Sequence, residues 1–279
     1  MAIADTSIQS LIVNESKIYA GTWSGNILFS ENNGDNWKSL NSSLPHDIRI
    51  MALAISGNNI FAATTNGVFL SSDNGISWSA INNGLTKLYV RSIVVKGKNI
   101  FIGTWGAGVF LSTNNGSNWI AINNGLKNLA IRSLASDGIN IFAATDGGGV
   151  FKSSNDGHNW TEINNGFTTF IIEVLAVQGS NVYAGMGRGV YASTNSGNNW
   201  SEVNYGLPPQ YVYALIINDE KIYAGNDHGV FVSSDNGNSW KELNNGFLPH
   251  TIIRSFAISG KTIFVGTERN GIWKRALPD

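Results

Sequence analysis

An eight-residue signature recurs along this chain at an almost constant interval, and its spacing restricts the possible fold more than any other feature. The signature has the form Ser-x-[Asp/Asn]-x-Gly-x-x-Trp, and its six copies end at Trp37, Trp78, Trp119, Trp160, Trp200 and Trp240. Successive copies are therefore 41, 41, 41, 40 and 40 residues apart. A fixed period of this length indicates stacked supersecondary units rather than one irregular fold.

One repeat, residues 86–126, contains four short apolar segments separated by turns rich in Gly and Asn. These segments are predicted strands, and they run over residues 90–95, 100–104, 109–112 and 119–122. Four-stranded units at this period are typical of a β-propeller. We therefore predict an all-β fold, a seven-bladed β-propeller of four-stranded antiparallel blades. It forms one domain over residues 1–279, with blades starting near residues 6, 46, 86, 127, 168, 208 and 248.

The seventh blade is incomplete in the sequence. It has three predicted strands, at residues 253–258, 263–266 and 271–274, and then neither a signature nor a fourth strand follows. Closing the ring hides the sheet edges, so a fourth strand is expected from elsewhere. We predict that residues 1–4 complete the seventh blade and join the two ends of the chain in one sheet. Truncation at the N-terminus is the alternative.

The residue types of the signature have a structural explanation. A short side-chain oxygen at the third position caps a tight turn, the glycine adopts a positive φ, and the tryptophan packs near a blade boundary. The third position is Asp only at Asp73 and Asp235, and it is Asn in the other four copies. The shared role is therefore hydrogen bonding, which argues against a repeated calcium site and against catalysis there. We expect no metal and no cofactor.

The signature resembles the Asp-box, also called the bacterial neuraminidase repeat. That motif occurs in sialidases, in xyloglucanase-type propellers, in sortilin-type receptors and in many secreted propellers. The resemblance covers the whole chain and implies the propeller fold. It says little about function, because one fold carries many functions.

Composition excludes several classes of partner. Charged residues make up 13% of the chain, the net charge is -1, and no run of Lys or Arg is present. We therefore expect no binding to nucleic acid and no insertion into a membrane. The chain has no cysteine, which excludes disulfides and thiolate metal sites.

A neutral surface rich in Asn, Ser, Thr and Gly is common in secreted bacterial proteins. We expect a monomer in an extracellular or cell-surface location. The first residues lack the basic and apolar segments of a signal peptide, so a mature domain cut from a longer exported protein is expected.

Alignment of the blades on their second strands places one equivalent residue at the start of each inner strand. These residues are Gln9, Met51, Arg91, Arg132, Glu173, Tyr213 and Arg254. Three arginines, a glutamate and a tyrosine should thus gather around one funnel, on the face opposite the signature turns. Three interpretations are open. The residues form a polar ring in which Glu173 pairs with Arg132, or they form an anion-binding site, or they form a catalytic site.

Two aromatic residues stand apart from the core pattern. Trp23 and Trp105 lie in glycine-rich loops between the second and third strands of their blades. Exposed indoles of this kind suit the C–H face of a sugar ring or a protein partner. Packing over the neighbouring blade is the alternative. The candidate ligand-binding residues are Trp23, Trp105, Arg91, Arg132, Arg254, Glu173 and Tyr213.

Three functions are compatible with this pattern. The preferred hypothesis is a non-catalytic binding or scaffold propeller, which recognises a glycan or a protein partner with the funnel face. The resemblance to sialidases and xyloglucanases implies a glycoside hydrolase as an alternative, with Glu173, Tyr213 and Asp146 as catalytic candidates and the arginines holding the substrate. A third possibility is an assembly factor, similar to the photosystem II assembly-factor propellers that present an arginine-rich face to a protein.

Overall fold

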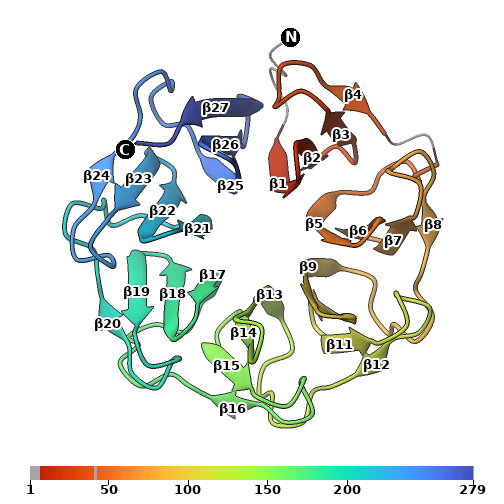
Figure 1. The fold of residues 1–279 in the computed structure, drawn as a ribbon. Helices are drawn as coiled ribbons and strands as arrows, with labels where there is room; N and C mark the ends of the chain where they lie inside the picture. The colour runs from red at the N-terminus through yellow and green to blue at the C-terminus, as the bar shows by residue number, and fades with distance from the viewer. Residues whose placement is uncertain (1–6, 41–42, 279) are drawn as a thin grey trace.

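The computed structural model describes residues 7–40 and 43–278, which form seven antiparallel sheets around a central axis (Figure 1). Six sheets contain four strands in chain order, and the seventh contains three. No helix occurs in the described residues. The predicted seven-bladed β-propeller is confirmed. The prediction that residues 1–4 complete blade seven lies outside the described residues.

The strands of each blade run from the axis to the rim. The inner strands are β1 (Ile8–Asn14), β5 (Ile50–Ser56), β9 (Val90–Lys96), β13 (Ile131–Ser136), β17 (Ile172–Gln178), β21 (Ala214–Asn218) and β25 (Ile253–Ser259). The second strands are β2 (Lys17–Thr22), β6 (Asn59–Thr64), β10 (Asn99–Thr104), β14 (Ile141–Thr145), β18 (Asn181–Met186), β22 (Lys221–Asn226) and β26 (Thr262–Thr267).

The outer half of each blade is shorter. The third strands are β3 (Ile27–Ser30), β7 (Gly67–Ser71), β11 (Gly108–Ser112), β15 (Val150–Ser153), β19 (Gly189–Ser193), β23 (Gly229–Ser233) and β27 (Ile272–Ala276). The fourth strands are β4 (Lys38–Ser39), β8 (Ser79–Ala80), β12 (Ile120–Ala121), β16 (Thr161–Glu162), β20 (Ser201–Glu202) and β24 (Lys241–Glu242).

The fourth strands have two residues each and are shorter than the sequence predicts. In blade three, Trp119 does not join the strand, because its amide donates a 2.9 Å hydrogen bond to the carbonyl of Asn83 in the preceding blade. The signature tryptophan therefore ties neighbouring blades together instead of lengthening its own sheet.

The blades pack through their inner and second strands. An apolar residue at the start of an inner strand lies against a glycine of the preceding blade, so that a Cβ on Gly21 would lie 2.4 Å from Ile50. The same contact closes the ring, since a Cβ on Gly266 of blade seven would lie 2.7 Å from Ile8 of blade one. Ser255 also donates a 3.2 Å hydrogen bond to the carbonyl of Ile8. The inner parts of blades seven and one therefore pack like those at the other boundaries.

Each signature turn is held by a short network of hydrogen bonds. In the third copy, the Ser112 hydroxyl donates to Asn114 Oδ1 at 2.9 Å and accepts from the amide of Gly116 at 2.8 Å. Asn114 Oδ1 also accepts from the amide of Asn118 at 3.0 Å. Gly116 has a φ of 81°. The predicted capping oxygen and positive φ are both confirmed, and they recur in the other copies.

Five of the signature tryptophans cross a blade boundary in the same way. The indole Nε1 donates to a backbone carbonyl that follows the fourth strand of the preceding blade, at 2.7 to 2.8 Å. The acceptors are Leu40, Ile81, Ile122, Ile163 and Val203. Trp37 differs, because it donates to the carbonyl of its own Gly34 at 3.2 Å. The preceding blade is blade seven, in which the described residues contain no fourth strand.

The choice between Asp and Asn follows the residue four positions later. Both Asp copies have a serine there, and its hydroxyl donates to the second carboxylate oxygen, at 2.5 Å from Ser77 to Asp73 and 2.6 Å from Ser239 to Asp235. The four Asn copies have another Asn at that position. These hydrogen bonds, first of all the one from the Ser77 hydroxyl, lower the pKa of Asp73 to about 2.

The depressed pKa of Asp73 makes one contribution to stability dependent on pH. A lowered carboxyl pKa stabilises the fold above the unfolded value of about 4, and this stabilisation is lost as the pH falls through the folded value. We expect Asp73→Asn to be less stable than the parent chain at pH 7, with the difference disappearing near pH 2. Urea denaturation at pH 7, 4 and 2 measures it, and Asp235→Asn should behave in the same way. A difference that stays constant with pH would contradict the role of the charge.

Candidate functional site

The candidate site is the funnel at the axis, and a backbone irregularity places its side chains there. In six blades the inner strand has a β-bulge, and the extra residue is Gln9, Met51, Arg91, Arg132, Glu173 or Arg254. A bulged residue is left out of the regular ladder, and its side chain is re-aimed. In blade six, Tyr213 occupies the equivalent position immediately before β21.

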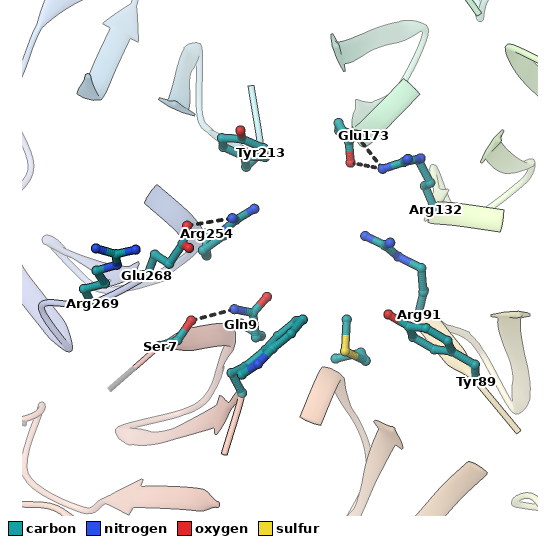
Figure 2. Close-up of a pocket in the computed structure, with 12 residues that line it drawn as sticks. Ser7, Gln9, Tyr89, Arg91, Arg132, Glu173, Tyr213, Arg254, Glu268 and Arg269 are labelled. Atoms are coloured by element: carbon teal, nitrogen blue, oxygen red, sulfur yellow. Dashed lines mark hydrogen bonds and ion pairs between the residues drawn. The ribbon is translucent and has the colours of Figure 1, made fainter. Parts of the chain in front are cut away.

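These seven residues line one cavity of about 450 Å³, together with Ser7, Trp23, Tyr89, Glu268 and Arg269. We call this cavity the funnel. Figure 2 shows the labelled side chains pointing toward the axis from blades on all sides. The structure thus brings together every inner-strand residue that the sequence alignment placed at the funnel. Two sequence candidates, Trp105 and Asp146, do not line the cavity itself.

Arg132 is neutralised by two carboxylates. Its Nη1 lies 2.5 Å from both oxygens of Glu173 in the next blade, and its Nε and Nη2 lie 3.0 and 2.8 Å from Asp146 Oδ1. The predicted pairing of Glu173 with Arg132 is present (Figure 2). Burial lowers the pKa of Arg132, but the two carboxylates outweigh it and raise the pKa above its ordinary value.

Arg254 is neutralised as well. Its Nη2 donates to Glu268 Oε2 at 2.6 Å, and its guanidinium carbon lies 4.3 Å from the ring centre of Tyr213. Burial raises the pKa of the Tyr213 hydroxyl, although the nearby Arg254 acts in the opposite direction. The phenol therefore stays protonated at neutral pH and is not prepared to act as a nucleophile.

Arg91 has no acidic partner. Among the described residues its guanidinium makes no hydrogen bond or ion pair, and it projects into the middle of the funnel (Figure 2). The ring of Trp105 lies beside it, with the guanidinium carbon 5.2 Å from the ring centre. Burial lowers the pKa of Arg91, and the neighbouring Arg132 acts in the same direction, whereas Tyr89, Glu173 and Asp146 act in the opposite direction without reversing the shift. A partly desolvated cation without a counter-ion gains the most from an anionic ligand.

The two candidate tryptophans have different surroundings. Trp105 is half-buried and lies beside both Arg91 and Arg132, at 5.2 Å from each guanidinium carbon. Trp23 lines the funnel and is 41% exposed, and Arg49 stacks on its ring at 4.0 Å. Trp105 therefore contacts Arg91 and Arg132 without lining the cavity, whereas Trp23 presents an aromatic surface at its mouth.

Sequence reasoning identified Glu173 as a partner of Arg132 but did not identify Asp146 and Glu268 as partners of arginines, although a signal for them exists. Asp146 and Glu268 each lie 14 residues after the arginine that they neutralise, directly after the second strand of the same blade. The same spacing from Arg91 leads to Trp105, which carries no charge. This difference explains which arginine is free. Ser7, Tyr89 and Arg269 were not singled out, because only the three-dimensional arrangement brings them to the funnel.

Other kinds of site are not apparent in the described part of the chain. No group of three or more His, Cys, Asp or Glu side chains is arranged to hold a metal ion among residues 7–40 and 43–278. No described helix is long and apolar enough to cross a membrane.

Comparison with known proteins gives a family and a fold. A family model described as a DUF6242 beta propeller domain matches residues 1–119 and again residues 89–228. No curated protein matches the chain.

Several solved structures are similar to the whole chain, all at low sequence identity. YCF48 bound to D1 peptide has a TM-score of 0.80 at 17% identity, and the alignment covers 100% of this chain and 95% of YCF48. YCF48 from Cyanidioschyzon merolae has a TM-score of 0.77 at 14% identity, with 100% and 97% covered. The GH74 xyloglucanase from Xanthomonas campestris has a TM-score of 0.77 at 14% identity, with 100% and 54% covered. These likenesses show the propeller fold alone.

Proposed function

This chain belongs to the DUF6242 β-propeller domain family, and from that premise we propose that it is a non-catalytic binding module that holds an acidic group of a protein partner in the funnel. The observation that carries the proposal is Arg91, a partly desolvated cation without a counter-ion inside a cavity of about 450 Å³. Arg132 and Arg254 are already neutralised and Arg269 is exposed, so a ligand carboxylate inside the cavity would be held by Arg91 first.

A peptide is the favoured ligand for two reasons. The cavity is open at the mouth and combines the unpaired Arg91 with aromatic side chains, which suits a carboxylate on a flexible chain. A similar propeller, YCF48, was solved with a peptide bound, which supports the same mode of use here. An extracellular or cell-surface location is part of the proposal, and the neutral, Asn-rich surface supports it.

The arrangement gives little support to glycoside hydrolysis. Glycosidases need one carboxyl group that can protonate the leaving group and a second that acts as base or nucleophile. Glu173 and Asp146 both bind the guanidinium of Arg132, so neither is free for those roles. Tyr213 has a raised pKa. The geometry of the funnel therefore supports binding of a charged ligand better than cleavage of a glycosidic bond.

The test compares a funnel arginine with a rim arginine. Acidic peptides with free and with amidated C-termini, and sialylated glycans, are screened against the parent chain, Arg91→Gln and Arg188→Gln. Arg188 is exposed in the β18–β19 loop and does not line the funnel. Its substitution makes the same change in net charge as Arg91→Gln. We expect peptide binding by the parent chain, with affinity reduced about tenfold to hundredfold in Arg91→Gln and unchanged in Arg188→Gln.

Other outcomes would change the conclusion. Equal weakening in both variants would show that only net charge matters, and the funnel proposal would then be wrong. Binding of sialylated glycans without peptides would keep the funnel as an anion site but reject the protein partner.

A further inference from the structure

Blade seven lacks the element that the other blade boundaries contain. Six boundaries hold a signature tryptophan, but at the boundary between blades six and seven the signature is replaced, because Arg275, Leu277 and Asp279 stand where its Ser, Asp/Asn and Gly would be. The carbonyl that would accept its indole is that of Leu243, the next member of the series after Ile163 and Val203. In the structure, Arg275 of β27 donates a 3.2 Å hydrogen bond to that carbonyl instead.

The apolar cage for a tryptophan is nevertheless present. Trp240 packs between blades five and six against Val190, Val203, Leu207, Ile222, Ala224 and Phe231. The residues equivalent to these, one blade later, are Val230, Leu243, Phe247, Ile263, Val265 and Trp273, and together with Asn245, Lys274 and Arg275 they line a cavity of about 400 Å³. Strand register supports the correspondence, because Ala224 pairs with Phe231 as Val265 pairs with Trp273. We call this cavity the rim slot.

Space for the backbone of the missing segment is also open. A Cβ on Gly84, Gly125, Gly166 or Gly206 would lie 2.2 to 2.4 Å from the carbonyl oxygen of the next signature tryptophan. Gly246 is the next member of this series, and a Cβ there would meet only the ring of Trp273 at 3.8 Å. The boundary between blades six and seven therefore leaves room for the backbone of a signature segment as well as for its tryptophan side chain.

Two unsatisfied elements border the rim slot. The indole nitrogen of Trp273 is buried and has no hydrogen-bond partner in the described part of the chain. Among the described residues, β27 pairs only with β26, whereas every other third strand also pairs with a fourth. In blade six, Phe231 and Val232 pair with Glu242 and Lys241. The equivalent residues of β27 are Trp273 and Lys274, and within residues 7–40 and 43–278 no strand pairs with their outer edge, which could accept a further strand.

We propose that the rim slot binds a β-strand of a separate polypeptide that carries the same signature. Its tryptophan fills the cavity and donates to the Leu243 carbonyl, and the two residues after it pair with β27. The occupied boundaries set the chemistry of this ligand, since they hold the same side chain in the same cage. All six signature tryptophans of this chain pack at their own boundaries, so a second folded copy has none to offer. The site lies on the rim and does not depend on the funnel.

A synthetic peptide provides a direct test. A fluorescein-labelled peptide with the sequence of residues 233–243 is titrated against the whole chain, and anisotropy reports binding. We expect saturable one-to-one binding, weakened at least tenfold when the peptide tryptophan is replaced by alanine. Hydrogen exchange should show newly protected amides in β27. Arg275→Ala should bind the peptide about fivefold more tightly, because the Leu243 carbonyl loses its present donor. Lys98→Ala, at an exposed residue between β9 and β10 of blade three, makes the same change in net charge outside the rim slot and should leave the affinity unchanged.

Several results would overturn the proposal. Binding that is absent, or that ignores the peptide tryptophan, would reject the slot as an indole site. Binding seen only after deletion of residues 1–6 would show that this chain fills the slot itself. A dimer in light scattering that Arg275→Ala disrupts would make a second copy the occupant. A loss of binding in Arg91→Gln would place the acidic peptide in the funnel, whereas unchanged binding in that variant supports the rim slot.

Discussion

The Trp160→Ala variant is expected to lose about 4 kcal/mol of its free energy of unfolding. Trp160 is 4% exposed and packs against core residues of blades three and four. Its indole also donates a 2.7 Å hydrogen bond to the carbonyl of Ile122 in the preceding blade. The substitution therefore leaves a large cavity at a blade boundary and an unpaired carbonyl. Urea denaturation followed by circular dichroism measures the loss.

Trp37→Ala is the matched control for this prediction. Trp37 belongs to the same signature, but it is half-buried and donates only to Gly34 of its own turn. Among the described residues its indole makes no hydrogen bond across the boundary between blades seven and one. A clearly smaller loss is expected. Equal losses in the two variants would show that the cross-boundary contacts of Trp160 do not determine its contribution.

The Arg132→Met variant is expected to lose about 3 kcal/mol. The side chains of Arg132 and Glu173 are only 17% and 12% exposed, and Asp146 binds the same guanidinium. Removing the cation leaves two carboxylates close together in a partly desolvated site, and each is then destabilised by the other. The measurement is again the free energy of unfolding in urea at neutral pH.

Two further variants separate charge from packing. In Arg132→Met with Glu173→Gln, one of the two stranded carboxylates is neutral, so part of the loss should be recovered. Arg91→Met removes an arginine of similar position that has no acidic partner, and it should leave stability unchanged or raise it slightly. A loss in Arg91→Met as large as in Arg132→Met would contradict the ion-pair explanation.

The repeat made the fold predictable, because the fold of a propeller depends on features that occur in every blade. The six tryptophans and the apolar segments of one repeat sufficed to predict the strands, the blade number and the turn network. The same alignment placed Arg91, Arg132 and Glu173 at one funnel, since equivalent positions in a closed ring must face the same axis.

Features that differ between blades were harder to predict. The sequence alone did not identify Arg91 as the unpaired arginine, because that depends on which acid reaches which guanidinium across a turn or a blade boundary. The rim slot was also not predictable, although the missing signature was visible. Whether such a gap collapses or stays open depends on how Arg275 and Trp273 pack, and only the structure gives that packing.

The bulges of the inner strands have a consequence for molecular diversification. A residue that lies outside the regular ladder can change without altering the strand pairing that holds its blade. Gln9, Met51, Arg91, Arg132, Glu173 and Arg254 show how widely such positions vary within one chain. The side chains at the axis can therefore differ from blade to blade while the strand pairing of the blades stays the same. New ligand specificities, whether selected in nature or from a combinatorial library, can be obtained there one blade at a time.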